Sequence, residues 1–553
     1  MTRVFLIIFL ALVAAAGLSF ERSPRTAEAA DSIAWAACGQ IECATFSVPL
    51  DYSNPGGETI SLSLIRIKAR EQSERIGVLM ANPGGPGGSA NDFVRIWRSI
   101  LAGDIRDRFD IVSFDPRGVG ESSPVVCHDR LQALVAVDPD PDTDAEWQLA
   151  KDVSQAFAVE CREKYANVLP HLGTKNVARD MDRIREALGE PKLNYVGYSY
   201  GTSIGGVYAD MFPDRIRAMV LDGGTDLSLD YEQTSLTQMI GFERAFEAYL
   251  ADCKAKSCAL AKSGEPRAAV DAIIARAEAE PLQSRNADRP AGPGEVQLGI
   301  ISAMYSKTSW NALTRALQDA QNGDGSGLVR LSDSYLQREG DGGYPNLIEA
   351  NIAINSVDTE CSKDPESYRA LGEEFAKQAP LFGRSAATSG LVCAYWAAKA
   401  DPVEAPEGKG APPIVVISTT NDPATPYEWG KALSEQLESG VLVTHRGEGH
   451  TIYAQGNACI DKVVNAYLLN GDVPAEGTTC GNGPPPPDSS GGVAAEPPPS
   501  VGDDDTTPRA PGPPSTGASD RRDGSAQVGL WAFGLAAVAL GAAVVAVAAA
   551  RRN

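Results

Sequence analysis

Basic residues and histidines are scarce in this chain, and the common short motifs for binding zinc or phosphate are missing. The 553 residues include 49 Lys and Arg against 72 Asp and Glu, which leaves a net charge of −23. This excess of negative charge argues against nucleic acid and anionic membrane surfaces as partners. Neither Cys-x-x-Cys nor Gly-Lys-Ser/Thr occurs. A common zinc motif and a phosphate-binding loop are therefore not expected.

Cysteine is present in an even number, and none of the ten residues lies in the apolar segments at the two ends of the chain. Outside the cell an even set usually pairs into disulfides. Connectivity does not follow from sequence alone, but pairing neighbours in order closes short loops. We therefore predict the pairs 38–43, 127–161, 253–258, 361–393 and 459–480. The alternative is a zinc site that includes His128, the only histidine beside a cysteine.

Both ends of the chain resemble targeting segments. Residues 1–30 combine Arg3, an apolar run and small residues, as a secretory signal peptide does; an uncleaved anchor is the alternative. Residues 528–550 carry no charge and precede Arg551 and Arg552. This pattern predicts a transmembrane helix with residues 551–553 in the cytoplasm and the body of the protein outside the cell.

Residues 481–527 are rich in Pro, Gly, Ser and Asp, a composition that predicts an extended linker without a core. Within it, "PPSTG" resembles the LPxTG signal that a sortase cuts when it attaches a protein to a bacterial cell wall, although Pro513 replaces the leucine. Attachment through Thr516 is thus one prediction. A stalk with a transmembrane anchor is the favoured one.

Between these ends, short apolar runs alternate with amphipathic stretches. "IGVLMANPGG", "LNYVGYSYG" and "PPIVVISTTND" predict buried strands of a mostly parallel sheet, and "NVARDMDRIREALG" a helix between strands. This alternation indicates an α/β layered fold. From 227 to 405 helical stretches replace the strands, which predicts a mostly helical insertion. The predicted organisation is a core in two parts (31–226 and 406–480) around this insertion (227–405).

Ser199 lies in "GYSYG", between a predicted strand and a predicted helix. That context is the one in which a Gly-x-Ser-x-Gly turn presents a nucleophile. The glycines at 197 and 201 let the turn tighten and the helix approach the sheet. The alternative is an ordinary serine in a tight turn.

A serine hydroxyl needs a base to take its proton, and the chain holds only four histidines. The order nucleophile, acid, histidine leaves His445 and His450 as candidates. His450 lies in a loop after a predicted strand and is our choice. His445 lies within the strand run "VLVTH" and is expected to be a surface residue at the strand end.

The acid that orients the imidazole should lie between the serine and the histidine. Asp422 in "STTNDPATP" follows the predicted strand "PIVVIS" and is our choice. Asp222 in "LDGG" also ends a strand, but capping a turn would explain it.

Acyl transfer also needs N–H donors for the oxyanion. Tyr200, the residue after the nucleophile, should supply one, and the glycine-rich loop "NPGGPGGSA" at 82–90 the other. Gly85 is the predicted donor in that loop, with Gly84 as the alternative.

The motifs "NPGGPGGS", "FDPRGVGESS", "GYSYGT", "MVLDGG", "NDPATP" and "GEGHT" occur in the order seen in one group of enzymes. The chain resembles α/β-hydrolase serine peptidases of the tripeptidyl aminopeptidase and prolyl iminopeptidase group, from about Cys43 to Cys480. Asn82-Pro83 replaces the histidine of the prolyl iminopeptidases, so the tripeptidyl type is the closer match.

The resemblance implies an α/β-hydrolase fold with a helical cap, and a secreted exopeptidase that removes short N-terminal pieces from peptides without a metal or organic cofactor. It assigns catalytic roles to Ser199, Asp422 and His450. Cap carboxylates in this group hold the free amino group of the substrate, and Asp358 and Glu360 in "SVDTEC" are the candidates. Two alternatives stay open: a carboxylesterase with the same triad, and a non-catalytic surface module on a hydrolase scaffold.

Overall fold

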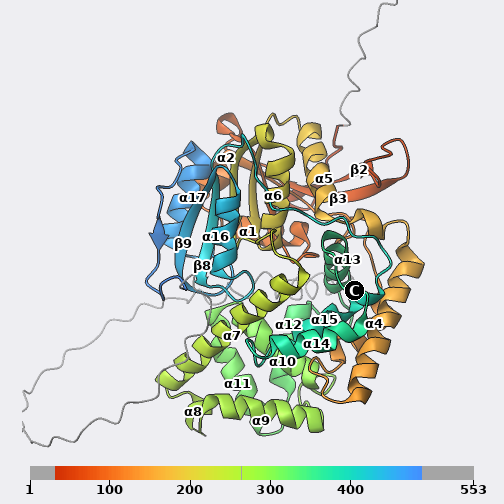
Figure 1. The fold of residues 1–553 in the computed structure, drawn as a ribbon. Helices are drawn as coiled ribbons and strands as arrows, with labels where there is room; N and C mark the ends of the chain where they lie inside the picture. Colours follow the sequence, from red (N-terminus) through yellow and green to blue (C-terminus); the bar gives the residue numbers. More distant parts are fainter. Residues whose placement is uncertain (1–31, 263, 488–553) are drawn as a thin grey trace, which may run out of the picture.

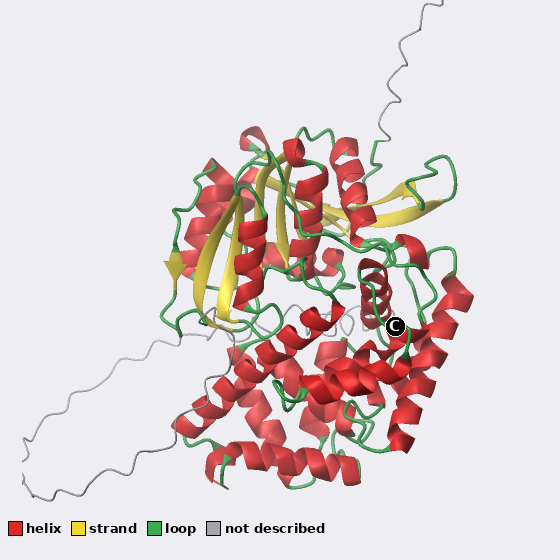
Figure 2. Cartoon of the chain, viewed as in Figure 1, coloured by secondary structure: helices red, strands yellow, loops and turns green. Residues whose placement is uncertain are grey.

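A single ten-stranded sheet organises the protein (Figure 2). The computed structural model describes residues 32–262 and 264–487. The strand order across the sheet is β1-β2-β3-β5-β4-β6-β7-β8-β9-β10. The strands are β1 (Ala36–Cys38), β2 (Ile41–Pro49), β3 (Thr59–Ile67), β4 (Gly77–Asn82), β5 (Phe109–Phe114), β6 (Leu193–Tyr198), β7 (Ile216–Asp222), β8 (Ile414–Asn421), β9 (Gly440–Glu448) and β10 (Thr479–Cys480).

Three neighbouring pairs at one side of the sheet are antiparallel, namely β1–β2, β2–β3 and β3–β5. All the other neighbouring pairs, from β5–β4 across to β9–β10, are parallel. All residues of β4, β5 and β6 are buried, as expected for strands covered on both faces. The predicted α/β fold with a mostly parallel sheet is confirmed.

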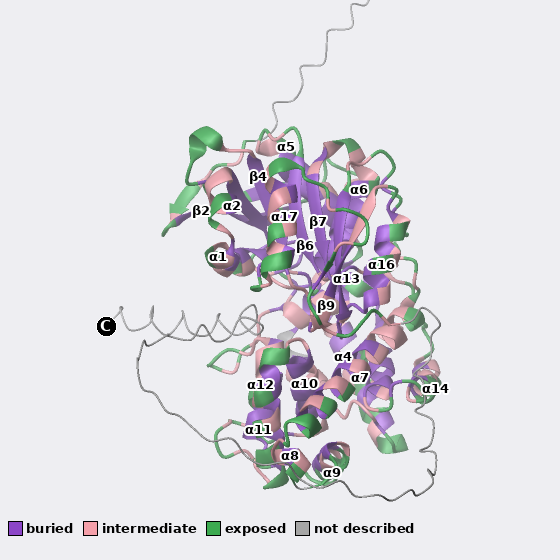
Figure 3. Ribbon diagram, turned by 90° about the vertical axis from the view of Figure 1, so that its left-hand side faces the viewer, coloured by how far each residue is buried: buried purple, intermediate pink, exposed green. Residues whose placement is uncertain are grey.

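Helices cover both faces of the sheet (Figure 3). On one face Trp97, Ile105 and Val464 join an apolar cluster with the strands, and on the other Met181 and Leu433 do so. The first group belongs to α1 (Ala90–Ile100), α2 (Gly103–Arg108) and α17 (Ala458–Asn470); the second face carries α5 (Thr174–Ala187), α6 (Tyr200–Met211) and α16 (Tyr427–Gln436). Short 3₁₀ turns connect these elements: η1 (Gln72–Glu74), η2 (Leu169–His171) and η3 (Pro213–Arg215).

A helical cap separates β7 from β8 in the chain and lies to one side of the sheet in space (Figure 1). It has its own apolar cluster, in which Phe246, Ile300 and Leu317 are fully buried. The cap helices are α7 (Tyr231–Ala255), α8 (Ala259–Lys262), α9 (Pro266–Ala279), α10 (Pro293–Met304), η4 (Lys307–Ser309), α11 (Trp310–Gln321), α12 (Ser326–Leu336), α13 (Leu347–Asp358), α14 (Pro365–Phe375) and α15 (Gly383–Tyr395). The predicted helical cap is therefore present.

Packing crosses the boundaries that the sequence suggests. The helices α3 (His128–Ala136) and α4 (Asp144–Tyr165) precede the nucleophile strand, yet Trp147 of α4 shares an apolar cluster with Leu391 of α15 and donates to Glu366. Conversely, Ile354 of α13 joins the cluster of the sheet rather than that of the cap. Helices that precede Ser199 in the chain therefore pack against cap helices, and a cap helix packs into the core of the sheet domain.

All ten cysteines pair in the predicted order, Cys38–Cys43, Cys127–Cys161, Cys253–Cys258, Cys361–Cys393 and Cys459–Cys480. Five disulfides are typical of proteins outside the cytoplasm. The zinc alternative loses its thiolate ligands, because Cys127 beside His128 is oxidised.

Within residues 32–262 and 264–487, no helix combines the length and apolarity that a bilayer crossing requires. The predicted signal peptide, the transmembrane span at 528–550, its cytoplasmic tail and the sorting signal with Thr516 lie outside the described residues.

Candidate active site

The predicted site residues follow the carboxyl ends of neighbouring parallel strands. Ser199 follows β6, Asp222 ends β7, Asp422 follows β8 and His450 lies just beyond β9. Because these strands are parallel and adjacent, their carboxyl ends meet at one edge of the sheet. Side chains that are far apart in sequence are thereby gathered at one edge, where open α/β sheets bind ligands.

Ser199 occupies a strained turn between β6 and α6. Its φ and ψ are 54° and −125°, a conformation that a non-glycine residue rarely adopts. A Cβ on Gly197 would lie 2.3 Å from the carbonyl oxygen of Gly201, so the first glycine is required for the turn to close. The backbone N–H of Ser199 donates to the carbonyl of Asp222 at 2.9 Å. The side chain is only partly buried. This is the geometry that the motif predicted.

Asp422 and His450 form a hydrogen-bonded pair. Nδ1 of His450 lies 2.9 Å from both Oδ1 and Oδ2 of Asp422. The Asp422 side chain is completely buried, and that of His450 is 9% exposed. Oδ1 of Asp422 also accepts the backbone N–H groups of Ala424 and Thr425, each at 2.9 Å. These bonds fix the carboxylate, which in turn fixes the ring and its tautomer.

The surroundings of His450 favour its protonated form. Burial opposes protonation, but the charge and hydrogen bond of Asp422 and the charge of Asp222 outweigh it, so the pKa of His450 lies above its ordinary value. An imidazole of this kind accepts a proton readily and is stabilised once charged, as a general base requires.

Asp222 and Gly223 lie between the serine and the histidine. Ser199 bonds to the backbone of Asp222, while a Cβ on Gly223 would lie 3.2 Å from Cε1 of His450. The nucleophile turn and the imidazole therefore contact the same two-residue segment.

The glycine-rich loop after β4 packs directly on the nucleophile turn. A Cβ on Gly84 would lie 2.8 Å from Cβ of Ser199 and 2.9 Å from the backbone nitrogen of Tyr200. The N–H of Gly84 already donates to Oδ1 of Asn82 at 2.9 Å, whereas Gly85 is exposed. Tyr200 begins α6, where backbone N–H groups have no partner within the helix. The structure thus brings the loop that holds both candidate glycines, and the N–H of Tyr200, to the nucleophile turn. Because the N–H of Gly84 is already bonded to Asn82, Gly85 stays the predicted donor in that loop.

Asp222 has a role that the sequence only partly indicated. Its Oδ2 accepts the backbone N–H groups of Ile452 and Tyr453, at 2.8 and 2.7 Å. Burial raises the pKa of this carboxyl to about 6. Asp222 therefore holds the loop that carries His450 without contacting the ring nitrogen.

His445 differs from the expectation of a surface residue at a strand end, which is wrong. It is 7% exposed, and Cys480 of the edge strand β10 is its pairing partner in the sheet, so β9 is not an edge strand here. Its Nδ1 lies 3.2 Å from Oγ1 of Thr419. Burial lowers the pKa of His445.

The two candidate amine-binding carboxylates, Asp358 and Glu360, lie at the end of α13. Asp358 is buried, and its oxygens accept bonds from the N–H (2.8 Å) and hydroxyl (2.5 Å) of Thr174. The Thr174 hydroxyl lies 2.6 Å from that of Tyr200. Burial raises the pKa of Asp358 to about 7. Asp358 thus joins the cap to α5 and, through Thr174, to the side chain of Tyr200, whereas Glu360 is exposed.

Sequence reasoning missed two residues beside the imidazole. Thr425 places its hydroxyl 3.1 Å from Asp422 Oδ2 and 3.3 Å from His450 Nδ1. Its spacing from Asp422, in a turn where the aspartate caps the following N–H groups, was an available signal. Tyr305 of the cap packs its ring on His450 with centroids 5.4 Å apart, and no sequence pattern pointed to it.

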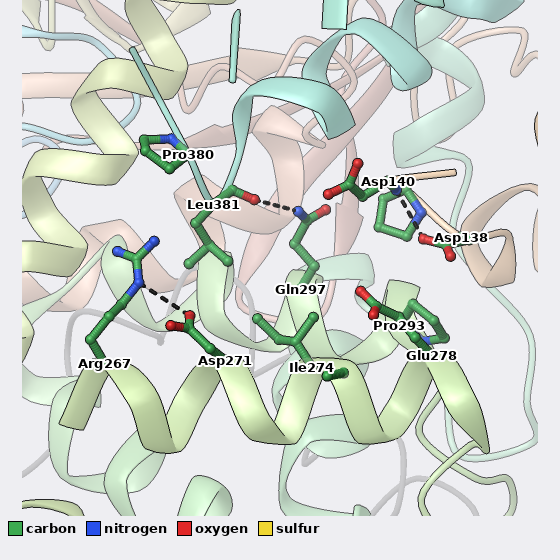
Figure 4. Close-up of a pocket in the computed structure, with 12 residues that line it drawn as sticks. Asp138, Asp140, Arg267, Asp271, Ile274, Glu278, Pro293, Gln297, Pro380 and Leu381 are labelled. Carbon is green, nitrogen blue, oxygen red and sulfur yellow. Dashed lines mark hydrogen bonds and ion pairs between the residues drawn. The ribbon is translucent and has the colours of Figure 1, made fainter. Parts of the chain in front are cut away.

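A separate cavity of about 210 Å³ lies where the cap meets the segment before β6, between α9, α10 and the loop before α4 (Figure 4). Four carboxylates line it, from Asp138, Asp140, Asp271 and Glu278, and Arg267 bonds to one of them, Asp271. Burial, with repulsion from neighbouring acidic groups, raises the pKa of Asp138 and Glu278. None of its lining residues belongs to the site at the sheet edge.

A hydroxyl on a strained strand-to-helix turn, with an imidazole and a buried carboxylate at the same edge of a parallel sheet, is the arrangement of serine hydrolases with the α/β-hydrolase fold. The chain is a serine hydrolase of this class. The family model described as "TAP-like protein" matches residues 379–480, which include the Asp422 and His450 segments.

Curated proteins extend this match to most of the chain. Serine protease Hip1 of Mycobacterium tuberculosis is 38% identical over 466 residues, which are 80% of this chain and 88% of that protein. Carboxylesterase B of M. tuberculosis is 36% identical, over 79% and 86% of the two chains. Tripeptidyl aminopeptidase of Streptomyces lividans is 34% identical, over 84% and 90%. The chain belongs to this family of TAP-like α/β-hydrolases.

Proposed function

We propose that this protein is a serine aminopeptidase that releases short peptides or single residues from the N-terminus of its substrates. The observation that carries the proposal is the buried Asp422–His450 pair beside the strained turn of Ser199. In the proposed reaction Ser199 Oγ attacks the scissile carbonyl carbon and His450 Nε2 takes the hydroxyl proton. The N–H groups of Tyr200 and Gly85 bind the oxyanion.

The tetrahedral intermediate then collapses to an acyl-enzyme. The carbon–nitrogen bond breaks, and the leaving amine takes the proton from His450. Water enters, loses a proton to His450 and attacks the ester, and Ser199 recovers its proton as the acid product leaves. Asp422 stabilises the imidazolium in both steps.

Exopeptidase specificity requires recognition of the free amino group. We assign that role to the carboxylates at the end of α13. Glu360 is exposed and can meet a substrate directly, whereas Asp358 is buried and its oxygens accept bonds from Thr174, so its part would be indirect. The names of the tripeptidyl aminopeptidase and serine protease relatives support peptide substrates.

We further propose that the protein acts outside the cell and is tethered there. The five disulfides and the signal-like residues 1–30 support secretion. The uncharged residues 528–550 support a transmembrane anchor, and the "PPSTG" motif with Thr516 offers wall attachment by a sortase as the alternative tether.

A panel of fluorogenic mono-, di- and tripeptidyl amides, each with a free or an acetylated N-terminus, tests the proposal. The full chain should hydrolyse free-amine substrates and lose activity when the amine is blocked, and Ser199→Ala should abolish both hydrolysis and labelling by a fluorophosphonate. Undiminished hydrolysis by Ser199→Ala would refute the mechanism. Equal turnover of blocked and free substrates would refute exopeptidase specificity.

A carboxylesterase is the second candidate, because a curated relative carries that name and the same triad cleaves esters. A short-chain acyl p-nitrophenyl ester in the same assay distinguishes the two. A kcat/KM for this ester far above that of every peptidyl amide would favour the esterase.

A further inference from the structure

The histidine loop is bonded to the cap as well as to the sheet. The backbone N–H of His450 donates to the carbonyl oxygen of Tyr305, the C-cap residue of α10, at 2.9 Å. The preceding Gly449 has a φ of +101°, and a Cβ there would lie 3.0 Å from the same carbonyl oxygen. The backbone of the loop therefore lies against the end of α10.

The Tyr305 side chain makes a second contact, with the imidazole itself. The two rings are nearly perpendicular, at 87°, with centroids 5.4 Å apart. This edge-to-face arrangement is favourable for aromatic pairs. Asp422 holds the imidazole at Nδ1 only, so the opposite edge of the ring, which carries Nε2, has no support from this pair. A ring packed beside the imidazole restricts movement of that edge.

Other cap residues fix Tyr305 in turn. Its ring lies 5.7 Å from that of Phe242 on α7 and 5.8 Å from that of Tyr335 on α12, measured between centroids. The pKa of the Tyr305 hydroxyl is well above its ordinary value because it is buried and close to Tyr335, so the side chain stays neutral. The neutral Tyr305 side chain thus packs against residues of two cap helices, α7 and α12, and also against the His450 imidazole.

The cap also supports the loop that carries the acid. The side-chain amide of Gln238 on α7 donates to the carbonyl of Ala424 at 2.7 Å. Gly241, one helical turn further, approaches so closely that a Cβ there would lie 2.7 Å from the carbonyl oxygen of Pro423. The cap therefore contacts both the loop that carries Asp422 and the loop that carries His450. The cap residues that make these contacts lie on α7 and at the end of α10, not on α13, which was given the role of peptide recognition.

We propose that Tyr305 is a positioning residue for His450, and that the cap is a structural part of the catalytic base rather than only a cover over it. This inference rests on the proposed function, because it assumes that His450 is the base. Tyr305 acts on the position of the imidazole and does not touch the reacting atoms.

Three variants of the full chain test the inference. Tyr305→Leu removes the ring, Tyr305→Phe keeps it without the hydroxyl, and Tyr249→Leu is the matched control. Tyr249 is a cap residue only 1% exposed, whose ring packs on Phe246 and Trp310. Displacement of a catalytic group by about 1 Å costs about 100-fold, so Tyr305→Leu should lower kcat by about 10- to 100-fold. KM should change little, and the rate of fluorophosphonate labelling should fall with kcat.

Tyr305→Phe should restore both rates to within about twofold, since the ring contact is kept. Tyr249→Leu should lower the melting temperature at least as much as Tyr305→Leu while leaving kcat and labelling unchanged. A Tyr305→Leu variant that folds and labels at the wild-type rate would overturn the inference, and so would an equal loss of labelling in Tyr249→Leu.

If Tyr305→Leu does not fold, Phe242→Leu decides the question, because it removes the ring behind Tyr305. Slower labelling in this variant supports the inference, and unchanged labelling overturns it. The proposed function fails by a different observation, namely a wild-type chain that is not labelled or a Ser199→Ala variant that retains hydrolysis.

Discussion

Replacing Asp422 by Asn tests the electrostatic half of the proposed mechanism without changing the size of the side chain. One oxygen, Oδ1, accepts two backbone N–H groups at 2.9 Å each. The other, Oδ2, faces the Thr425 hydroxyl at 3.1 Å and a distant N–H of Thr451 at 3.5 Å. The NH₂ group of the new asparagine cannot occupy the Oδ1 position, because two backbone N–H donors point at it there. At the Oδ2 position it can donate to the Thr425 hydroxyl, which can rotate to accept the hydrogen bond. The amide should therefore place its nitrogen at the Oδ2 position.

In that orientation the oxygen of the new amide can still accept from Nδ1 of His450, so the tautomer is partly preserved. The negative charge is lost, and with it the largest influence that raises the pKa of His450. In serine-protease triads this exchange lowers kcat about 10⁴-fold, mainly through the wrong tautomer. With the tautomer partly kept, we expect a loss of about 10³- to 10⁴-fold in kcat, or about 4 to 5.5 kcal/mol of transition-state stabilisation.

Steady-state kinetics on the best peptidyl amide measures this loss, and its pH dependence supplies a second readout. Burial still disfavours the imidazolium in the variant, so the acid limb of kcat/KM should move to lower pH. Asp222→Asn is the comparison, because its Oδ2 position can keep both loop N–H groups and the ring nitrogen is not its partner. It should cost no more than about tenfold. An Asp422→Asn variant with more than about a tenth of wild-type kcat would refute the assignment of the acid.

Three further predictions concern the base, the glycine loop and the disulfides. The free base is the neutral imidazole and the pKa of His450 is raised, so kcat/KM should fall as the pH drops through a midpoint above 6.5; a midpoint below that value contradicts the pairing. Gly84→Ala should lose most labelling of the nucleophile, because its φ is +92° and the new Cβ would lie 2.5 Å from the carbonyl of Tyr198; Gly39→Ala, with φ +74° and open space, should label normally. A disulfide that closes a longer loop restricts the unfolded chain more and should stabilise the fold more. Removing Cys127–Cys161, which spans 34 residues, should lower the free energy of unfolding in urea by about 4 kcal/mol, and removing Cys253–Cys258, which spans 5, by about 2 kcal/mol. Equal losses would contradict this argument.

The sequence was sufficient for those parts of the site that depend on local patterns at strand ends. Parallel strands place every carboxyl end at one edge, so recognising "VGYSYG", "ISTTND" and "GEGH" as strand-to-loop transitions was enough to bring Ser199, Asp422 and His450 together. The disulfides were predictable for a similar reason, because each pair is close in sequence. His445 was misjudged because the short strand β10, only Thr479–Cys480, gives no periodic signal of its pairing with β9.

Contacts between the cap and the core had no such local signal. Tyr305 reaches His450 only because α10 ends where the histidine loop turns, and that relation depends on how several cap helices pack together. Asp358 was predicted to bind the substrate's amino group from the family resemblance alone, yet it is buried, and its oxygens accept bonds from Thr174. The residues proposed for catalysis therefore lie at the strand ends, where local sequence patterns reveal them. The contacts that hold these residues in place depend on tertiary packing across the boundary between core and cap. Variants of Tyr305 and Thr174, rather than of the triad, would reveal how far activity depends on that packing.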